Sequence, residues 1–147
     1  MLFRSPVNLR GVRVGLPICE DIWSADVVEC LAETGSELLL VPNGSPYFRG
    51  KSDVRLNIAV ARVTESRLPL VYLNQIGGQD DLVFDGASFV LNSDSSLACQ
   101  LSSFTQQVVM TEWTRQAEGW RCREDAKALP FDDDKADYAA CVLGLRS

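Results

Sequence analysis

Residues 38–41 constrain the fold of this chain more than any other segment. They form the run Leu-Leu-Leu-Val, and an uninterrupted apolar run of strand length is typical of strands that are covered on both faces. Segments 12–18 and 70–75 are rich in β-branched and aromatic residues and also predict strands. Helical patterns lie between the three strands, at 24–35 and at 52–66. This alternation with short connections predicts an α/β layered domain.

The two helices are predicted from apolar stripes and, in the first helix, from signals at its ends. Ser24 is the expected N-cap, Asp26 lies in the first turn, where the helix dipole favours an anion, and Gly35 is the expected stop. The stripes consist of Val27, Val28, Leu31 and Ala32 in the first helix and of Leu56, Ala59, Val60 and Val63 in the second.

Beyond the third strand the pattern changes to short strands joined by turns. The segment 77–80, Gly-Gly-Gln-Asp, differs from the phosphate loop of ATP pyrophosphatases, because Ile76 and Asp81 stand where that loop has serines, and it is predicted to form a turn. An antiparallel meander is expected from strands around Phe84 and at 86–92, 97–101 and 108–113.

The last part of the chain is predicted to leave this domain. Residues 121–135 are charged and irregular and indicate a linker. Residues 136–147 resume an apolar pattern that fits a helix. The predicted organisation is therefore one domain over 1–120, a linker over 121–135, and the first helix of another domain over 136–147.

Composition excludes several classes of function. The chain of 147 residues contains no histidine, so alone it cannot use an imidazole base or a histidine-ligated metal. A net charge of -6 offers no footprint for nucleic acid. No segment is apolar and long enough to be a signal or a membrane span, which predicts a cytoplasmic protein with no membrane partner. Five cysteines without CxxC spacing predict reduced thiols and no metal site.

Cys19 is the strongest candidate for a catalytic residue. It follows a predicted buried strand and precedes a helix after a short turn, where backbone N–H groups can hold an oxyanion and a helix N-terminus can lower a thiol pKa. The alternative is a buried structural cysteine. Without histidine, the base for such a thiol has to be a carboxylate or a lysine. Glu20 and Asp21 are adjacent, and Asp21 is predicted to accept backbone N–H groups at the turn.

The segment after the strand at 38–41 is a second candidate site. It carries a hydroxyl at Ser45, an aromatic ring at Tyr47 and cations at Arg49 and Lys51. Open α/β sheets place ligand-binding groups at this end of their strands. The alternative is a solvated turn.

Several motifs resemble one enzyme family. Residues 15–23, Gly-Leu-Pro-Ile-Cys-Glu-Asp-Ile-Trp, resemble the nucleophile motif of the nitrilase, or carbon–nitrogen hydrolase, superfamily. Segments 42–47, 72–89 and 138–146 resemble the bacterial glutamine-dependent NAD synthetases, in which a nitrilase-like glutaminase domain supplies ammonia to an ATP-using synthetase domain. The resemblance covers nearly the whole chain. It implies half of a nitrilase-like α-β-β-α sandwich, with a mixed sheet and helices on one face.

The resemblance also implies roles for single residues. The family uses a Glu-Lys-Cys triad, and Cys19 matches its cysteine, whereas no motif here matches the glutamate or the lysine. By the same resemblance, Ser45 and Lys51 help to bind glutamine and the Glu20 backbone N–H contributes to the oxyanion site. No cofactor is implied for this chain, and ATP and Mg belong to the synthetase domain.

These implications define the expected function and its alternatives. The chain is expected to be part of a glutamine-dependent NAD synthetase, to be inactive by itself, and to need the remainder of the polypeptide as partner. Nitrilase-like domains also oligomerise, so a homo-oligomer is expected. One alternative is a stand-alone amidase of the nitrilase superfamily, and the other is a non-catalytic oligomerisation module.

Overall fold

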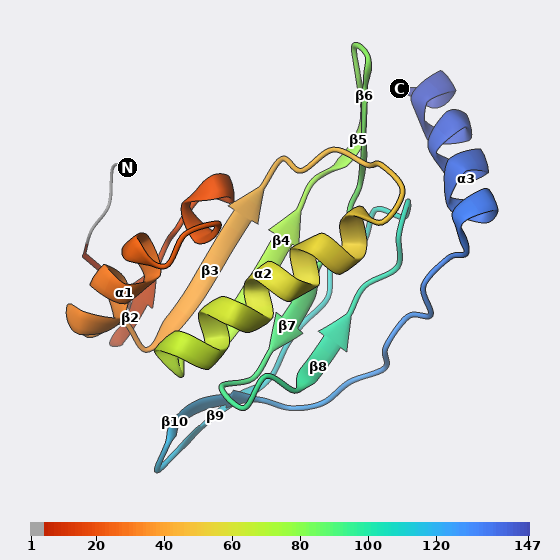
Figure 1. Ribbon diagram of the computed structural model, residues 1–147. Helices are drawn as coiled ribbons and strands as arrows, with labels where there is room; N and C mark the ends of the chain where they lie inside the picture. The colour runs from red at the N-terminus through yellow and green to blue at the C-terminus, as the bar shows by residue number, and fades with distance from the viewer. Residues whose placement is uncertain (1–4) are drawn as a thin grey trace.

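A six-stranded mixed sheet forms the centre of the chain (Figure 1). The computed structural model describes residues 5–147, and residues 1–4 lie outside the described part. In chain order the elements are β1 (Val7–Leu9), β2 (Val12–Gly15), the 3-10 helix η1 (Cys19–Ile22), α1 (Asp26–Glu33), β3 (Leu38–Asn43), α2 (Lys51–Ser66), β4 (Leu70–Asn74), β5 (Ile76–Gln79), β6 (Leu82–Asp85), β7 (Phe89–Leu91), β8 (Leu97–Gln100), β9 (Trp113–Gln116), β10 (Gly119–Cys122) and α3 (Asp133–Arg146).

The order of strands in the central sheet is β1-β2-β3-β4-β7-β8. Strands β2, β3 and β4 are parallel, whereas β1, β7 and β8 each pair antiparallel to their neighbours. The parallel strands are the three that the sequence predicted, and α1 and α2 are the crossovers between them. The predicted α/β architecture with a mixed sheet is confirmed.

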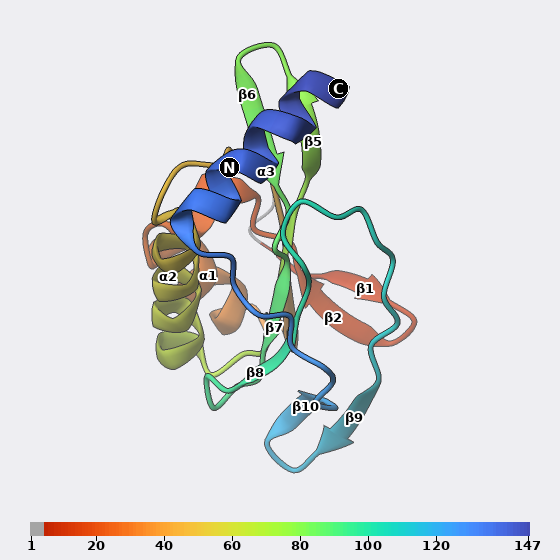
Figure 2. The same ribbon diagram turned by 90° about the vertical axis from the view of Figure 1, so that its right-hand side faces the viewer.

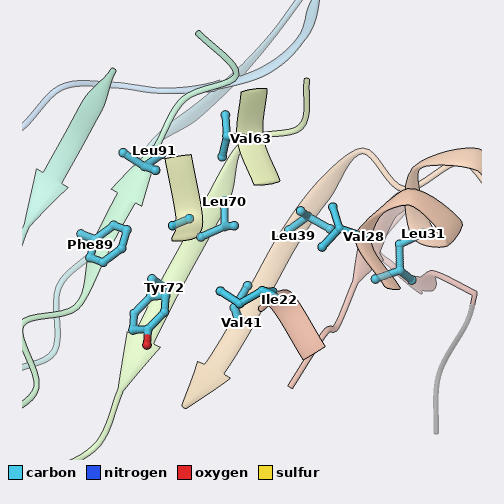
Figure 3. Close-up of a cluster of buried hydrophobic side chains, with 11 residues drawn as sticks. Ile22, Val28, Leu31, Leu39, Val41, Val63, Leu70, Tyr72, Phe89 and Leu91 are labelled. Atoms are coloured by element: carbon cyan, nitrogen blue, oxygen red, sulfur yellow. The ribbon is translucent and has the colours of Figure 1, made fainter. Parts of the chain in front are cut away.

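Helices α1 and α2 cover one face of the sheet (Figure 2). Their buried side chains meet alternate residues of the strands, as the two-residue repeat of a strand requires. Figure 3 shows this core, which comprises Ile22, Val28, Leu31, Leu39, Val41, Ala59, Val63, Leu70, Tyr72, Phe89 and Leu91.

The opposite face of the sheet is less covered. A second cluster of Val90, Ala98, Cys99 and Cys122 packs there with partly buried Trp113. Leu38 and Leu40 of β3 are only half-buried, and Leu73 of β4 is 56% exposed. The run at 38–41 predicts a strand buried on both faces. Within residues 5–147, only one face of β3 is fully buried.

The predicted C-terminal end of α1 is confirmed, whereas its predicted N-cap is wrong. Gly35 adopts φ 91° directly after Thr34, the C-cap of α1, which suits a helix stop. The N-cap of α1 is Ala25, so Ser24 does not serve as the predicted cap. Helix α2 begins at Lys51, next to the predicted start.

The predicted antiparallel meander consists of separate pieces. Strands β7 and β8 join the central sheet, whereas β5 with β6 and β9 with β10 form two hairpins of their own. Of the segment predicted as a turn, residues 77–79 lie in β5 and only Asp80, where φ is 52°, lies in the turn. The strand predicted at 108–113 is wrong, because only Trp113 belongs to a strand. Val108 and Met110 are 97% and 87% exposed, so their apolar side chains have no surface to pack on.

The C-terminal part leaves the sheet and then meets the β5–β6 hairpin. Residues 121 and 122, predicted within the linker, belong to β10. Residues 123–132 then run beside β8, where the Asp125 and Ala128 N–H groups donate to Ala98 and Gln100. Helix α3 begins at Asp133, whose neighbour Asp132 caps it, and packs against β5 and β6 (Figures 1 and 2). Among residues 5–147, no helix has the length and apolar character needed to cross a membrane.

Candidate active site

Cys19 lies at the sharp turn that the sequence predicts. Strand β2 ends at Gly15 and η1 begins with Cys19 itself. The φ angle of Cys19 is 51°, in the left-handed region that side-chain-bearing residues rarely adopt. Such strained backbone conformations concentrate at functional sites. The position of Cys19 fits the predicted elbow, and its role as nucleophile stays a prediction.

Asp21 holds this turn in place. Its Oδ2 accepts a hydrogen bond from the Ile18 N–H at 2.9 Å, and its own N–H donates to the Ile18 carbonyl at 3.0 Å. The prediction that Asp21 is a structural acceptor is confirmed. Glu20 is exposed, and its carbonyl accepts from the Trp23 N–H at 2.9 Å. The proposed oxyanion role of the Glu20 N–H stays a prediction.

Hydrogen bonds fix the backbone N–H, the carbonyl and the hydroxyl of Ser45. Its N–H donates to Asn74 Oδ1 at 2.9 Å, and its carbonyl accepts from Asn74 Nδ2 at 3.1 Å. Arg55 of α2 donates from Nε to Ser45 Oγ at 3.0 Å and from Nη2 to the Ser45 carbonyl at 2.8 Å. The Asn74 amide therefore continues the β3–β4 pairing past the end of β3. This clasp explains why Ser45, in a segment without regular structure, is buried.

The Arg55 guanidinium, which binds Ser45, also forms an ion pair with the Asp85 carboxylate. Arg55 Nη1 donates to Asp85 Oδ2 at 3.0 Å, and Nη2 lies 2.8 Å from Oδ1, an ion-pair distance without the angle of a good hydrogen bond. The side chains of Arg55 and Asp85 are only 3% and 2% exposed. A buried charge pair is costly to desolvate unless its hydrogen bonds are satisfied, and here the loop carbonyls and the Ser45 hydroxyl satisfy most of them.

Lys51 lies beside Ser45 at the start of α2. Its ammonium is 4.5 Å from the centre of the Phe48 ring and 5.5 Å from that of Trp23, so two aromatic faces stabilise its charge. Lys51 and Ser45 line the same small cavity, of about 10 Å³, together with Tyr72. That volume holds roughly one water molecule. Within residues 5–147 it is therefore not a pocket of glutamine size.

Tyr72 connects this cavity with Cys19. Burial raises the pKa of Tyr72, while the charge of Arg55 and a hydrogen bond with Ser45 act in the opposite direction. A charge on Cys19 also acts to raise this pKa. Figure 3 shows the Tyr72 hydroxyl beyond the apolar core, toward the end of β4. The structure thus brings Ser45, Lys51 and Tyr72 around one cavity, with Cys19 nearby.

A second set of contacts ties the outer side of the segment at 44–50, hereafter the 44–50 loop, to α3. The Tyr47 hydroxyl donates to Asp137 Oδ1 at 2.6 Å, and Arg49 Nε donates to Asp137 Oδ2 at 2.8 Å. Arg49 Nη2 also lies 3.0 Å from Asp134. Burial and the Asp137 carboxylate raise the pKa of Tyr47 to about 12, while Tyr47 and Arg49 hold the pKa of Asp137 below its usual range.

Sequence reasoning missed Asn74, Arg55 and Asp85. One signal was available for Arg55: it lies one turn before Ala59 and so shares the apolar stripe of its helix. A charge on that face predicts a buried partner. Nothing in the sequence shows that the partner is Asp85, because the ion pair joins elements 30 positions apart. No cluster of acidic, cysteine or histidine side chains within residues 5–147 is arranged to hold a metal ion.

Comparison with known proteins agrees with this geometry. Residues 2–121 match the family described as carbon-nitrogen hydrolase. The chain belongs to the carbon-nitrogen hydrolase family. Other carbon-nitrogen hydrolases share its fold, among them an amidase from Nesterenkonia sp. AN1 that aligns at 28% identity with a TM-score of 0.60, over 66% of this chain and 36% of the amidase. In that structure the acetamide moiety of fluoroacetamide is covalently added at the active site cysteine.

Two relatives extend the similarity beyond the hydrolase family. A glutamine-dependent NAD(+) synthetase from Rhodobacter capsulatus is 52% identical over 141 residues, which are 96% of this chain and 26% of that protein. The structure of the glutamine-dependent NAD+ synthetase from Acinetobacter baumannii in complex with ADP aligns with a TM-score of 0.87 at 34% identity, over 96% of this chain and 26% of that one. The predicted resemblance and the nitrilase-like fold are confirmed. The carbon-nitrogen hydrolase chain spans about a quarter of the length of these two relatives.

Proposed function

We propose that the chain is the C-terminal half of the glutaminase domain of a glutamine-dependent NAD synthetase. The observation that carries the proposal is Cys19 at a left-handed turn of a carbon-nitrogen hydrolase fold, with the hydroxyl of Ser45 and the ammonium of Lys51 around the neighbouring cavity. The similarity to two synthetases over 96% of the chain supports glutamine as the amide substrate.

The proposed reaction is thiol-dependent amide hydrolysis. The Cys19 Sγ attacks the side-chain amide carbon of glutamine, and the carbonyl oxygen takes the negative charge and faces the Glu20 N–H. Collapse of this intermediate breaks the carbon–nitrogen bond, and the nitrogen leaves as ammonia with the proton taken from the thiol. Water then attacks the thioester, which releases glutamate and restores the thiol. By the resemblance to the family's Glu-Lys-Cys triad, we assign the base and the stabilising cation to a glutamate and a lysine elsewhere in the polypeptide, in keeping with a chain that has no histidine to act as base.

The remainder of the polypeptide is the proposed consumer of the ammonia. We propose that residues 123–132 lead into a synthetase domain whose first helix is α3, and that this domain amidates deamido-NAD with ATP and Mg. The glycine pair of β5 does not fit a phosphate loop, because the Gly78 N–H donates to Ser147 Oγ and an added Cβ on Gly78 would lie 3.2 Å from Gly144. A cytoplasmic location and a homo-oligomer remain predictions.

The 147 residues alone are proposed to be inactive. They contain Cys19 but no motif that matches the glutamate and lysine of the family triad, so a thiol without its base should not turn over glutamine. Ammonia release by the isolated chain above that of its Cys19→Ala variant would contradict this proposal.

The decisive experiment replaces Cys19 by alanine in the full-length protein to which we propose this chain belongs. We expect glutamine hydrolysis and glutamine-driven NAD synthesis to disappear while ammonia-driven synthesis survives. Loss of both activities would show that Cys19 is structural. Survival of glutamine hydrolysis would show that another residue is the nucleophile. Hydrolysis of other amides without NAD synthesis would instead favour a stand-alone amidase.

A further inference from the structure

We propose that the exposed face of helix α3 is a docking surface for the polypeptide that follows Ser147 in the full-length protein. This exposed face consists of Tyr138, Cys141, Val142 and Leu145, which share one side of the helix because they are spaced three and four positions apart. The inference rests on the proposed function, since it takes the segment after Ser147 to be the synthetase domain. In this arrangement α3 packs between two domains.

The first argument is the distribution of apolar side chains around α3. Residues 139–145 are apolar without interruption, Ala-Ala-Cys-Val-Leu-Gly-Leu, over roughly two helical turns. A helix that is apolar on all sides is normally buried on all sides. Within residues 5–147, Ala140 is the only residue of α3 that is buried, whereas Tyr138 is 73% and Leu145 is 90% exposed. Helix α2 differs, since its exposed residues beyond the first turn are polar, namely Asn57, Thr64 and Glu65.

The second argument is that another side of α3 already holds the helix on the hydrolase fold. The Gly78 N–H donates to Ser147 Oγ at 2.8 Å, and a Cβ added to Gly78 would lie 3.2 Å from Gly144. The Tyr47 hydroxyl donates to Asp137 at 2.6 Å. Figure 1 shows the β5–β6 hairpin on one side of α3 and no element of residues 5–147 on the other. The exposed face is therefore available for a further partner.

A shallow pocket beside the exposed face gives this partner an apolar site to fill. It has a volume of about 250 Å³ and is lined by Phe104, Phe131 and Tyr138. Exposed apolar surface of this kind marks interaction sites. The charged residues that line the pocket are Lys135 and Arg146, from the first and last turns of α3. The partner surface is therefore inferred to be apolar at its centre and acidic at its edge.

The similarity to known proteins indicates which partner this is. The match to the carbon-nitrogen hydrolase family ends at residue 121, before α3 begins. The alignment with the 52% identical synthetase covers 96% of the chain, which leaves too few residues unaligned to omit the 14 residues of α3. Helix α3 is therefore shared with a protein about four times as long as this chain and lies outside the hydrolase match. This favours the synthetase part of the polypeptide over a second copy of the hydrolase domain.

The first test identifies the neighbour of Tyr138 in the full-length protein. Tyr138 is replaced by the photoreactive residue p-benzoylphenylalanine, the protein is irradiated, and the cross-linked peptides are identified by mass spectrometry. We expect cross-links to residues after Ser147 of the same polypeptide. Denaturing gel electrophoresis distinguishes these from cross-links between copies, which double the mass. Cross-links between copies, cross-links confined to Ser147 and the residues before it, or no cross-link at all would overturn the proposal.

Cys141 provides an independent measurement, because it lies on the exposed face and its side chain is exposed within residues 5–147. Alkylation by N-ethylmaleimide is followed peptide by peptide in the native full-length protein, with Glu118→Cys in the β9–β10 turn as an exposed reference. Rates in urea correct for the intrinsic reactivity of the two thiols. Cys141 is expected to react at least about tenfold more slowly than the reference, since its modification requires local opening. Equal rates would overturn the proposal.

A charge on the exposed face should open the docked surface. Leu145→Lys in the full-length protein is expected to raise the alkylation rate of Cys141 about tenfold, because an unpaired charge is costly to bury. Leu129→Lys is the matched control, since Leu129 is 87% exposed and lies outside α3. Equal effects of the two variants on Cys141 would overturn the proposal. If Leu145→Lys does not fold, the cross-linking and the alkylation of Cys141 without this substitution still decide.

Cys19→Ala separates this inference from the proposed function, because it changes no residue of α3. Glutamine hydrolysis that survives in Cys19→Ala contradicts the proposed function. Loss of hydrolysis in that variant, together with a Cys141 alkylation rate equal to that of the exposed reference, contradicts only the docking of α3.

Discussion

Two ion pairs hold the 44–50 loop from opposite sides, and they differ in almost every physical respect. On the inner side, Arg55 and Asp85 are 3% and 2% exposed and clasp Ser45. On the outer side, Arg49 and Asp137 have side chains that are 57% and 41% exposed, and they join the loop to α3. Burial makes the inner pair dependent on complete hydrogen bonding, whereas water screens the outer pair.

The two ion pairs therefore have different roles: the inner pair fixes Ser45, and the outer pair joins the 44–50 loop to α3. The inner contacts are made by α2, β4 and β6, within the part of the chain that matches the hydrolase family, and none of the hydrogen bonds that hold Ser45 comes from α3. The outer contact depends on α3, which we propose belongs to the next domain. The comparison predicts that changes to the inner side are large and alter Ser45, and that changes to the outer side are small and sensitive to salt and pH.

The largest effect is expected from Arg55→Met. This change leaves the Asp85 carboxylate buried without its cation, and breaking a buried pair in this way costs about 3–5 kcal/mol. Urea unfolding of the chain should show this loss, while Arg49→Met on the outer side should shift the midpoint far less. Equal shifts for the two variants would break the comparison.

A smaller loss is expected from Asn74→Ala. It removes the partners of both the N–H and the carbonyl of Ser45 while Arg55 still holds that carbonyl. Leaving a buried N–H unsatisfied costs about 1–3 kcal/mol. The same urea titration measures it, with exposed Asn57→Ala as control. A loss no greater than that of the control would mean that the Asn74 clasp does not hold the loop.

Asp137→Asn is expected to destabilise the chain less than either inner variant. Its effect should shrink further in concentrated salt, because screening weakens exposed charge pairs. Tyr47 and Arg49 lower the pKa of Asp137 in the folded state. The stabilisation is therefore present above the unfolded-state pKa and disappears as the pH falls through the lower folded-state pKa. Thermal melting of wild type and variant should converge in acid, and a gap that persists there would contradict the assignment.

The smallest change concerns the ionisation of Tyr47. Burial and Asp137 raise its pKa to about 12 from an ordinary value of 10.0, so the tyrosine stays neutral in moderately alkaline solution. Asp137→Asn should lower this pKa while burial still keeps it above the ordinary value. Ultraviolet titration of phenolate, with Tyr47→Phe to identify the signal, measures the shift. An unchanged titration would show that Asp137 does not contact Tyr47 in solution.

The sequence predicted the parts of this molecule that depend on local patterns. The parallel strands, both covering helices and the turn at Cys19 follow from apolar periodicity and turn residues that lie close together in the chain. Asp21 was assigned correctly for the same reason, since its partner Ile18 is three positions away. The strand predicted at 108–113 failed, because apolar residues form a strand only where a partner strand or a packing surface exists.

The inner clasp could not be predicted in the same way. Ser45 was a candidate from its place after β3, but its hydrogen-bond direction depends on Arg55, and the orientation of Arg55 depends on Asp85. These contacts join α2 to a loop and to a hairpin strand, and only the folded topology brings them together. A charge within an apolar helical stripe shows that a partner exists, and it does not identify that partner.

The most direct test of the account is the covalent state of Cys19 during turnover. The full-length protein is mixed with glutamine, quenched in acid and digested, and the peptide that contains Cys19 is examined by mass spectrometry. The account predicts a glutamyl thioester on Cys19 that is absent from Cys19→Ala and scarcer in Ser45→Ala at subsaturating glutamine. A glutamyl group on another residue, or turnover of glutamine with Cys19 never modified, would contradict it.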